Sequence, residues 1–278
     1  MKIGAMDNVL VKPWTELFDE AARLGFDGVE LDLKVETYLD SEVWSEAGRR
    51  ALVDRSRRAG VAPVAGVAPL AGVAPLAGVE IASVCMASVA GLMTKPETHD
   101  QGIEALADLR RYCDELGAGV ILFPMIKQAD QSEEEAVELW RDGFTRAFAE
   151  AERPPGSDGA RAKVGMESVG RVGRSADQAL AMIEAVGSPQ LGVYYDVGNA
   201  DYQSFDGIAE MKQLGSHIVQ IHVKEIGAEM GEGKLDFPAI FSTIRQIGYD
   251  GYLILETEAG DDPAANALRN LEFVRSLL

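Results

Sequence analysis

The chain has 278 residues, of which 47% are hydrophobic and 26% are charged, as in an ordinary globular protein. Asp and Glu outnumber Lys and Arg by 45 to 26, giving a formal net charge of −19, and such a surface repels nucleic acids and anionic membranes. Two cysteines cannot form a disulfide framework, and no apolar stretch approaches membrane-spanning length. We therefore expect a cytoplasmic protein with no nucleic-acid or membrane partner.

The first half of the chain alternates short apolar runs with amphipathic stretches, a pattern typical of consecutive β-strands and α-helices. Four strands are predicted, and a helix follows each of them. This order is typical of a parallel β-sheet that is covered by helices. The strands are expected at residues 2–6, 28–32, 79–85 and 119–124, and the helices at 13–24, 45–59, 97–116 and 132–152.

The second half repeats the same order with shorter connections. Eight strand–helix units make up a (β/α)8 TIM barrel, which typically needs about 250 residues. We therefore predict an α/β fold in which residues 1–278 form a single TIM-barrel domain. The later strands are expected at residues 163–167, 191–196, 217–223 and 251–256, and the later helices at 175–186, 206–214, 237–247 and 263–278.

A tandem hexapeptide interrupts this order between the second helix and the third strand. It reads AGVAPV, AGVAPL and AGVAPL over residues 59–76, and AGVEIA follows it. The proline in each copy disfavours a helix interior or a central strand. Removing the three copies would restore an ordinary connection, so we interpret residues 59–76 as an expansion of that connection. The alternative is an extended segment that contacts another subunit or a partner.

Four strands of the second half end on a residue that can bind a divalent metal, namely Glu167, Asp196, His222 and Glu256. In a closed parallel barrel, the C-terminal ends of these consecutive strands are neighbours around one rim. Three carboxylates and one imidazole suit Mn²⁺, Mg²⁺, Co²⁺ or Zn²⁺. The sequence therefore predicts a site for one divalent metal ion, with Mn²⁺ favoured.

Other residues of the same types are less suitable as ligands. Glu258 shares a strand face with Glu256, but Glu256 directly follows the apolar run YLIL and is preferred. His217 begins its strand at the end opposite His222 and is expected to be structural. His99 has no evident partner in the sequence and is expected on the surface.

At this point the chain resembles the xylose isomerase-like barrels of the sugar phosphate isomerase and epimerase group. The resemblance covers nearly the whole chain apart from the hexapeptide expansion. It implies that the family's metal ligands fall at the four residues named above. Its most specific segments are LGFDGVEL (24–31), GVYYDVGNA (192–200), HIVQIHVKE (217–225) and GEGKLDFPAIFSTIRQIGYDGYLILETE (231–258).

The resemblance also implies a reaction on a sugar or keto-polyol. A metal that holds both oxygens of an α-hydroxy ketone acidifies the intervening C–H and stabilises the enediolate that forms. One carboxylate removes the proton, and a second on the opposite face can return it and invert the centre. Glu167 and Glu256 are the expected acid/base pair as well as metal ligands, while Asp196 and His222 are expected mainly to anchor the metal.

Six further residues could contact the substrate, and one of them is Asn199, three residues after the expected ligand Asp196. Glu30 lies on a strand where the family often places a polar group near the substrate, and a buried structural role is the equal alternative. Lys224 and Glu225 follow the histidine ligand and could bind substrate hydroxyls or pair with each other. Arg171 and Arg174 lie in a Gly-rich loop; they could reach an anionic group, but surface exposure is preferred.

The reaction type is less sharply indicated than the metal site. Some ketose epimerases have a histidine three residues after the aspartate ligand that contacts the sugar, whereas this chain has Asn199 there. An inosose dehydratase-like lyase and a non-catalytic barrel that binds metal or sugar are therefore alternatives. A DNA-repair nuclease of this fold is disfavoured, because three histidines cannot supply its metal site. Barrels of this group often pair, so a homo-oligomer stays open.

Overall fold

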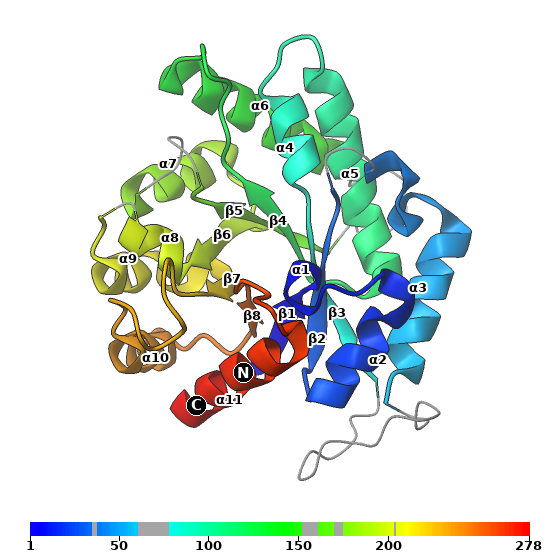
Figure 1. Ribbon diagram of the computed structural model, residues 1–278. Helices are drawn as coiled ribbons and strands as arrows, with labels where there is room; N and C mark the ends of the chain where they lie inside the picture. The colour runs from blue at the N-terminus through cyan, green and yellow to red at the C-terminus, as the bar shows by residue number, and fades with distance from the viewer. Residues whose placement is uncertain (35–37, 61–77, 152–160, 170–174, 203) are drawn as a thin grey trace.

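The computed structural model describes residues 1–34, 38–60, 78–151, 161–169, 175–202 and 204–278 (Figure 1). In this part of the chain, eight parallel strands form one closed barrel in chain order, and the last strand pairs with the first. The predicted (β/α)8 TIM barrel is therefore confirmed. The strands are β1 (Lys2–Met6), β2 (Gly28–Asp32), β3 (Glu80–Cys85), β4 (Val120–Pro124), β5 (Lys163–Glu167), β6 (Leu191–Asp196), β7 (Ile218–Val223) and β8 (Tyr252–Leu255).

Burial explains why the strands could be recognised as short apolar runs. Helices cover the outer faces of the strands and side chains fill the interior, so both faces of each strand are removed from water. Every residue of β4 and β6 is buried. The observed bounds differ from the predicted ones by at most one residue at either end.

Among the described residues, eight longer helices surround the barrel at or near their predicted positions (Figure 1). None of these helices is both long and apolar enough to cross a membrane. They are α2 (Trp14–Leu24), α3 (Glu46–Arg58), α5 (His99–Leu116), α6 (Glu133–Ala151), α7 (Ala176–Val186), α9 (Gly207–Leu214), α10 (Phe237–Gln246) and α11 (Pro263–Leu277).

Three short helices were not predicted. α1 (Asp7–Leu10) and α8 (Val197–Tyr202) begin directly after β1 and β6, and α4 (Ala87–Met93) begins one residue after β3. All three therefore lie at the C-terminal end of the barrel, where parallel α/β barrels carry their functional residues. Segments of one or two turns are too short to show a helical repeat of apolar residues.

Most of the hexapeptide expansion falls at residues 61–77, outside the described residues. The residues on either side of it are hydrogen-bonded to each other: the backbone N–H of Gly78 donates to the carbonyl of Ala59 at 3.0 Å, and that of Val79 donates to Ser56 at 2.9 Å. The end of α3 and the residues just before β3 therefore lie side by side. The interpretation as an expansion agrees with this contact and stays a prediction.

Candidate functional site

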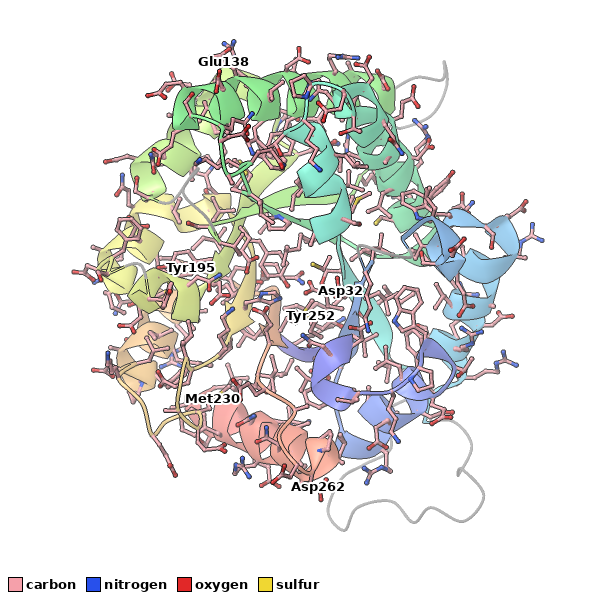
Figure 2. All side chains as sticks on the ribbon, turned by 45° about the horizontal axis from the view of Figure 1, so that its top comes forward. Asp32, Glu138, Tyr195, Met230, Tyr252 and Asp262 are labelled. Atoms are coloured by element: carbon pink, nitrogen blue, oxygen red, sulfur yellow. The ribbon has the colours of Figure 1, made fainter. Side chains whose placement is uncertain are left out.

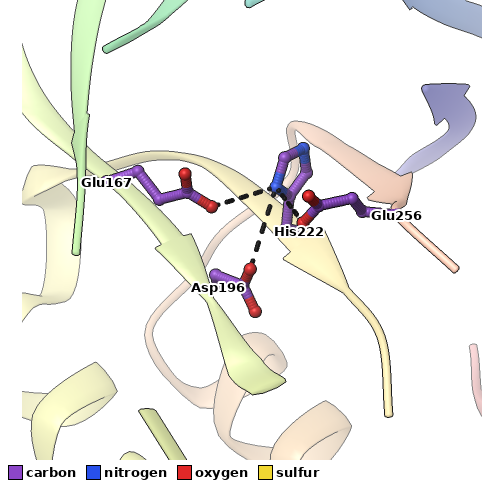
Figure 3. Close-up of side chains that lie close together, drawn as sticks. All are labelled: Glu167, Asp196, His222 and Glu256. Atoms are coloured by element: carbon purple, nitrogen blue, oxygen red, sulfur yellow. Dashed lines mark hydrogen bonds and ion pairs between the residues drawn. The ribbon is translucent and has the colours of Figure 1, made fainter. Parts of the chain in front are cut away.

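The four predicted ligands come together at the C-terminal rim of the barrel (Figure 3). Glu167 ends β5, Asp196 ends β6, His222 lies near the end of β7, and Glu256 directly follows β8. One potential ligand atom from each residue lies within 4.8 Å of all the others. The first three residues are buried, and the Glu256 side chain is 25% exposed. The cluster is thus largely shielded from water but open on one side.

The imidazole of His222 is the centre of this cluster. Its Nδ1 atom lies 3.0 Å from Glu256 Oε2 and 3.2 Å from Glu167 Oε1, and Asp196 Oδ2 is 4.0 Å away. Carboxylates accept hydrogen bonds and repel one another, so a cation at this point relieves an otherwise unfavourable grouping. The neighbouring carboxylates raise the pKa of His222 against the opposing effect of burial.

Glu30 holds the other side of the same imidazole. Its Oε1 atom lies 2.9 Å from His222 Nε2, and the Glu30 side chain is fully buried. A carboxylate on the far nitrogen of a metal-binding histidine fixes the tautomer and the ring orientation. With Nε2 engaged in this way, Nδ1 is left to face the other three carboxylates.

Glu30 is itself fixed by a buried hydrogen-bond network across the barrel interior. Its Oε2 atom accepts from the hydroxyl of Ser83 at 2.5 Å and from that of Tyr194 at 2.7 Å. The amide of Gln220 donates to the same two hydroxyl oxygens at 2.6 and 3.0 Å. Ser83, Tyr194 and Gln220 were not predicted as site residues. The sequence did contain one indication of their place. Ser83, Tyr194 and Gln220 lie two residues before Cys85, Asp196 and His222, respectively, and therefore on the same face of the strand as those residues.

The ammonium group of Lys224 lies at the edge of the cluster and pairs with two of its carboxylates. Its ammonium lies 2.6 Å from Asp196 Oδ2 and 2.7 Å from Glu256 Oε2. Burial alone would raise the pKa of Glu256, but His222 and Lys224 together hold it well below its usual range. Burial raises the pKa of Glu167 to about 7, although His222 acts in the opposite direction. The two glutamates therefore differ in their affinity for a proton.

The start of α8 orients Asp196. The backbone N–H groups of Gly198 and Asn199 donate to its Oδ1 atom at 2.8 and 2.9 Å, which leaves Oδ2 facing the cluster. The side-chain amide of Asn199 donates to Glu167 Oε1 at 3.4 Å. Asn199, predicted to contact the substrate, therefore contacts one of the expected proton carriers.

The remaining predicted contact residues are less central. Lys224 pairs with two of the cluster carboxylates, whereas Glu225 packs against Gly233: a Cβ atom added there would come within 2.1 Å of the Glu225 carboxyl carbon. Glu258 is exposed and lies outside the cluster, as preferred from the sequence. Arg171 and Arg174 lie outside the described residues.

The surface position predicted for His99 is wrong. This histidine is only 8% exposed. Its Nδ1 atom lies 2.6 Å from the carbonyl oxygen of Met93 at the end of α4, and its Nε2 atom lies 2.9 Å from Asp142 on α6. His99 therefore joins two helices that are distant in sequence, which the residues around it could not reveal. His217 is exposed just before β7, at the end opposite His222.

The donor set and its spacing fit a divalent metal ion. Metal–oxygen and metal–nitrogen bonds of about 2.0–2.2 Å place the ligands of one ion roughly 3–4 Å apart. The distances around His222 Nδ1, 3.0, 3.2 and 4.0 Å, fall in this range. Three carboxylates and one imidazole are also the ligands that such ions prefer, and a fourth carboxylate, that of Glu30, contacts the far nitrogen of the imidazole.

Comparisons with known proteins agree with this fold. L-ribulose-5-phosphate 3-epimerase UlaE of Escherichia coli (strain SMS-3-5 / SECEC) is 26% identical over 277 residues, covering 95% of this chain and 89% of that protein. The structure of D-allulose 3-epimerase from Methylomonas sp. superposes with a TM-score of 0.76 at 16% identity, covering 100% of this chain and 97% of that one. The apo structure of 3-keto-D-glucoside 4-epimerase YcjR from E. coli has a TM-score of 0.73 at 18% identity, covering 99% of both chains. The family described as xylose isomerase-like TIM barrel matches residues 18–277, and the chain belongs to this family.

Proposed function

We propose that this protein is a divalent-metal-dependent epimerase or isomerase of a sugar or keto-polyol that contains an α-hydroxy ketone. The observation that carries the proposal is the cluster of Glu167, Asp196, His222 and Glu256 at the C-terminal rim. The three relatives named above are all epimerases of sugars or sugar derivatives, and they support the reaction class. An acidic, partly open cluster inside a barrel also suits a small neutral substrate better than a macromolecule.

The same four residues would hold the metal ion, and Mn²⁺ is the ion to test first. When bound, the ion polarises the substrate carbonyl and so acidifies the neighbouring C–H group. Asp196 and His222 are the anchoring ligands, because backbone N–H groups orient the first and Glu30 orients the second. The ion would neutralise carboxylate charge that His222 and Lys224 otherwise balance.

Glu167 and Glu256 are the proposed proton carriers. Glu167 ends β5 and Glu256 directly follows β8, and the two lie on either side of the His222 ring (Figure 3). A substrate held between them presents one face to each carboxylate, so one glutamate can remove the C–H proton and the other can return a proton to the opposite face. Return from the opposite face inverts the carbon centre and gives epimerisation.

Replacing each glutamate by glutamine tests these roles. With ketoses and inososes in D₂O, the Mn²⁺-loaded wild type should exchange the C–H proton and form the epimer. Glu167→Gln and Glu256→Gln should each lower kcat by about 10²–10⁴-fold, the usual contribution of a positioned acid or base. Glu258→Gln is the matched control, because this exposed glutamate lies two residues from Glu256 and should leave kcat unchanged.

The same assay separates the alternatives. Loss of water from an inosose would identify a dehydratase-like lyase. Binding of metal and sugar with no proton exchange in any substrate would identify a non-catalytic barrel. Unchanged turnover in both glutamine variants would contradict the acid/base roles of the two glutamates.

A further inference from the structure

The ammonium group of Lys224 contacts the same carboxylate oxygens that a metal ion at the cluster would use. It lies 2.6 Å from Asp196 Oδ2 and 2.7 Å from Glu256 Oε2. These two oxygens also face His222 Nδ1, at 4.0 and 3.0 Å. The other oxygen of Asp196 accepts two backbone hydrogen bonds, so Oδ2 is the atom that Asp196 offers to a cation. Lys224 and a metal ion therefore depend on the same two oxygen atoms.

A divalent ion at the cluster and this ammonium group would repel each other. An ion bonded to Asp196 Oδ2 at about 2.0–2.2 Å would lie at most about 5 Å from an ammonium group that is 2.6 Å from the same oxygen. Two positive charges at that separation repel strongly in a largely buried site, because little water screens them. The ion therefore binds with its full affinity only when the ammonium group moves away.

The fold provides a defined path for the Lys224 side chain. Its stem lies against Gly198 of α8: a Cβ atom added to this glycine would come within 2.7 Å of Lys224 Cγ and 3.2 Å of Lys224 Cε. Gly198 is buried, so the side chain that it lacks leaves the room through which the lysine reaches the carboxylates. The position of the ammonium group thus rests on packing as well as on charge.

The backbone around Lys224 is held on both sides. The carbonyl of Val223 accepts a hydrogen bond from the backbone N–H of Glu256 at 3.3 Å. Farther along the connection, Met230 is buried and lies beside α11 in Figure 2, and the glycine that follows it packs against the Phe273 ring of that helix. The lysine side chain is 15% exposed and lies on the open side of the cluster, next to Glu256. Its ammonium group can therefore leave the carboxylates toward water by side-chain rotation alone.

We propose that Lys224 is an internal competitor of the metal ion: its ammonium group bridges Asp196 and Glu256, and metal binding displaces it toward the open side of the cluster. The lysine lowers the affinity of the site for every cation. A divalent ion that gains four ligands displaces it, whereas a monovalent ion gains only half the electrostatic attraction. The proposal rests on the proposed function, because that function places a metal ion at the cluster.

Two uncharged variants test the competition in full-length protein that has been stripped with EDTA and dialysed. Lys224→Met keeps the length of the stem, and Lys224→Gln keeps a hydrogen-bond donor. In isothermal titration calorimetry, both should bind Mn²⁺ with a Kd at least tenfold lower than that of the wild type. In EDTA, both should have a Tm lower by about 3 °C or more, because buried carboxylates lose a counter-ion.

The opposite signs of these two effects identify competition, since a merely structural lysine would lower both stability and metal affinity when it is replaced. Lys212→Met is the matched control. It makes the same change in net charge at an exposed position near the C-terminal end of α9, and it should leave the Kd for Mn²⁺ and the Tm unchanged.

Sugar turnover separates this inference from the proposed function. If both Lys224 variants bind Mn²⁺ more tightly but the wild type converts no sugar, the competition holds and the catalytic proposal fails. If the wild type converts a sugar but neither variant binds Mn²⁺ more tightly than it does, the competition is overturned. If neither the wild type nor the variants bind Mn²⁺, the metal site and the competition are both overturned.

Discussion

Glu30 is not one of the four clustered residues, but its buried carboxylate orients the His222 ring. Its two oxygens have different partners: one contacts the His222 ring, and the other accepts hydrogen bonds from Ser83 and Tyr194. The carboxylate cannot rotate without losing all three contacts. The direction of the imidazole, and with it the direction of Nδ1, therefore follows from residues on β2, β3 and β6.

Replacing Glu30 by glutamine should weaken metal binding without unfolding the protein. The amide has the same shape but no charge, and changes to such outer carboxylates typically cost 10–100-fold in metal affinity. We expect the Kd for Mn²⁺, measured by isothermal titration calorimetry, to rise by about that factor. Glu80→Gln, an exposed glutamate at the opposite end of β3, is the control. Equal Mn²⁺ affinity in wild type and Glu30→Gln would contradict the orienting role.

The grouping of the four predicted ligands could be expected from the sequence because each lies at or near the end of an apolar run, which is a local pattern. The partners of Glu30 could not be found in this way, since Tyr194 meets Glu30 only after the barrel closes. From the sequence alone, a substrate contact and a structural role were therefore equal alternatives for Glu30. His99 was placed wrongly for the same reason, because its partner Asp142 lies on another helix.

At the scale of whole elements, regular units were easier to predict than irregular ones. The strands and the long helices bury continuous or periodic apolar residues, so their patterns are visible in one dimension. α1, α4 and α8 have four, seven and six residues, which is too short for a periodic pattern. These unpredicted helices nevertheless shape the rim, and α8 supplies the N–H groups that orient Asp196.

The hexapeptide expansion should be removable. Deleting residues 59–76 joins Arg58 to Ala77, so that an Ala-Gly pair again follows α3. The hydrogen bond between Gly78 and Ala59 shows that the two ends to be joined already lie next to each other. A shorter connection loses less entropy on folding, so we expect the free energy of unfolding to rise by roughly 1–2 kcal/mol. Urea denaturation would measure this change.

Excision of the middle copy alone, residues 65–70, provides the graded control and should have a smaller effect of the same sign. Sugar turnover by the deleted protein should match that of the wild type, since the expansion follows α3 and so belongs to the end of the barrel away from the cluster. Loss of cooperative unfolding in the deletion variant would show that the segment packs against the barrel.

For the molecule as a whole, the net charge of −19 and the buried carboxylates both favour the approach of cations. The general negative potential raises the local concentration of cations around the protein. In the proposed metal site, the four clustered residues would then select among these cations by ligand type and spacing. Salt screens the general attraction over a Debye length of about 8 Å at physiological ionic strength, but it affects the buried cluster much less.

Removal of the metal should therefore lower the stability of the protein measurably. Adding Mn²⁺ at about 100 times its Kd to protein treated with EDTA should stabilise the fold by about 2.7 kcal/mol. This corresponds to a rise in Tm of roughly 5–10 °C, which differential scanning calorimetry would detect. The double variant Glu167→Gln/Asp196→Asn is the control and should show little shift. A shift as large as in the wild type would place the metal elsewhere.

The buried network across the barrel interior has a consequence for protein engineering. A designer who grafted only the four donor residues onto another eight-stranded barrel would obtain a freely rotating imidazole and three mutually repelling acids. Catalytic grafts of that kind lose precision when their supporting shell is omitted. The smallest transferable unit also includes the side chains that span the lumen, namely Glu30, Ser83, Tyr194 and Gln220.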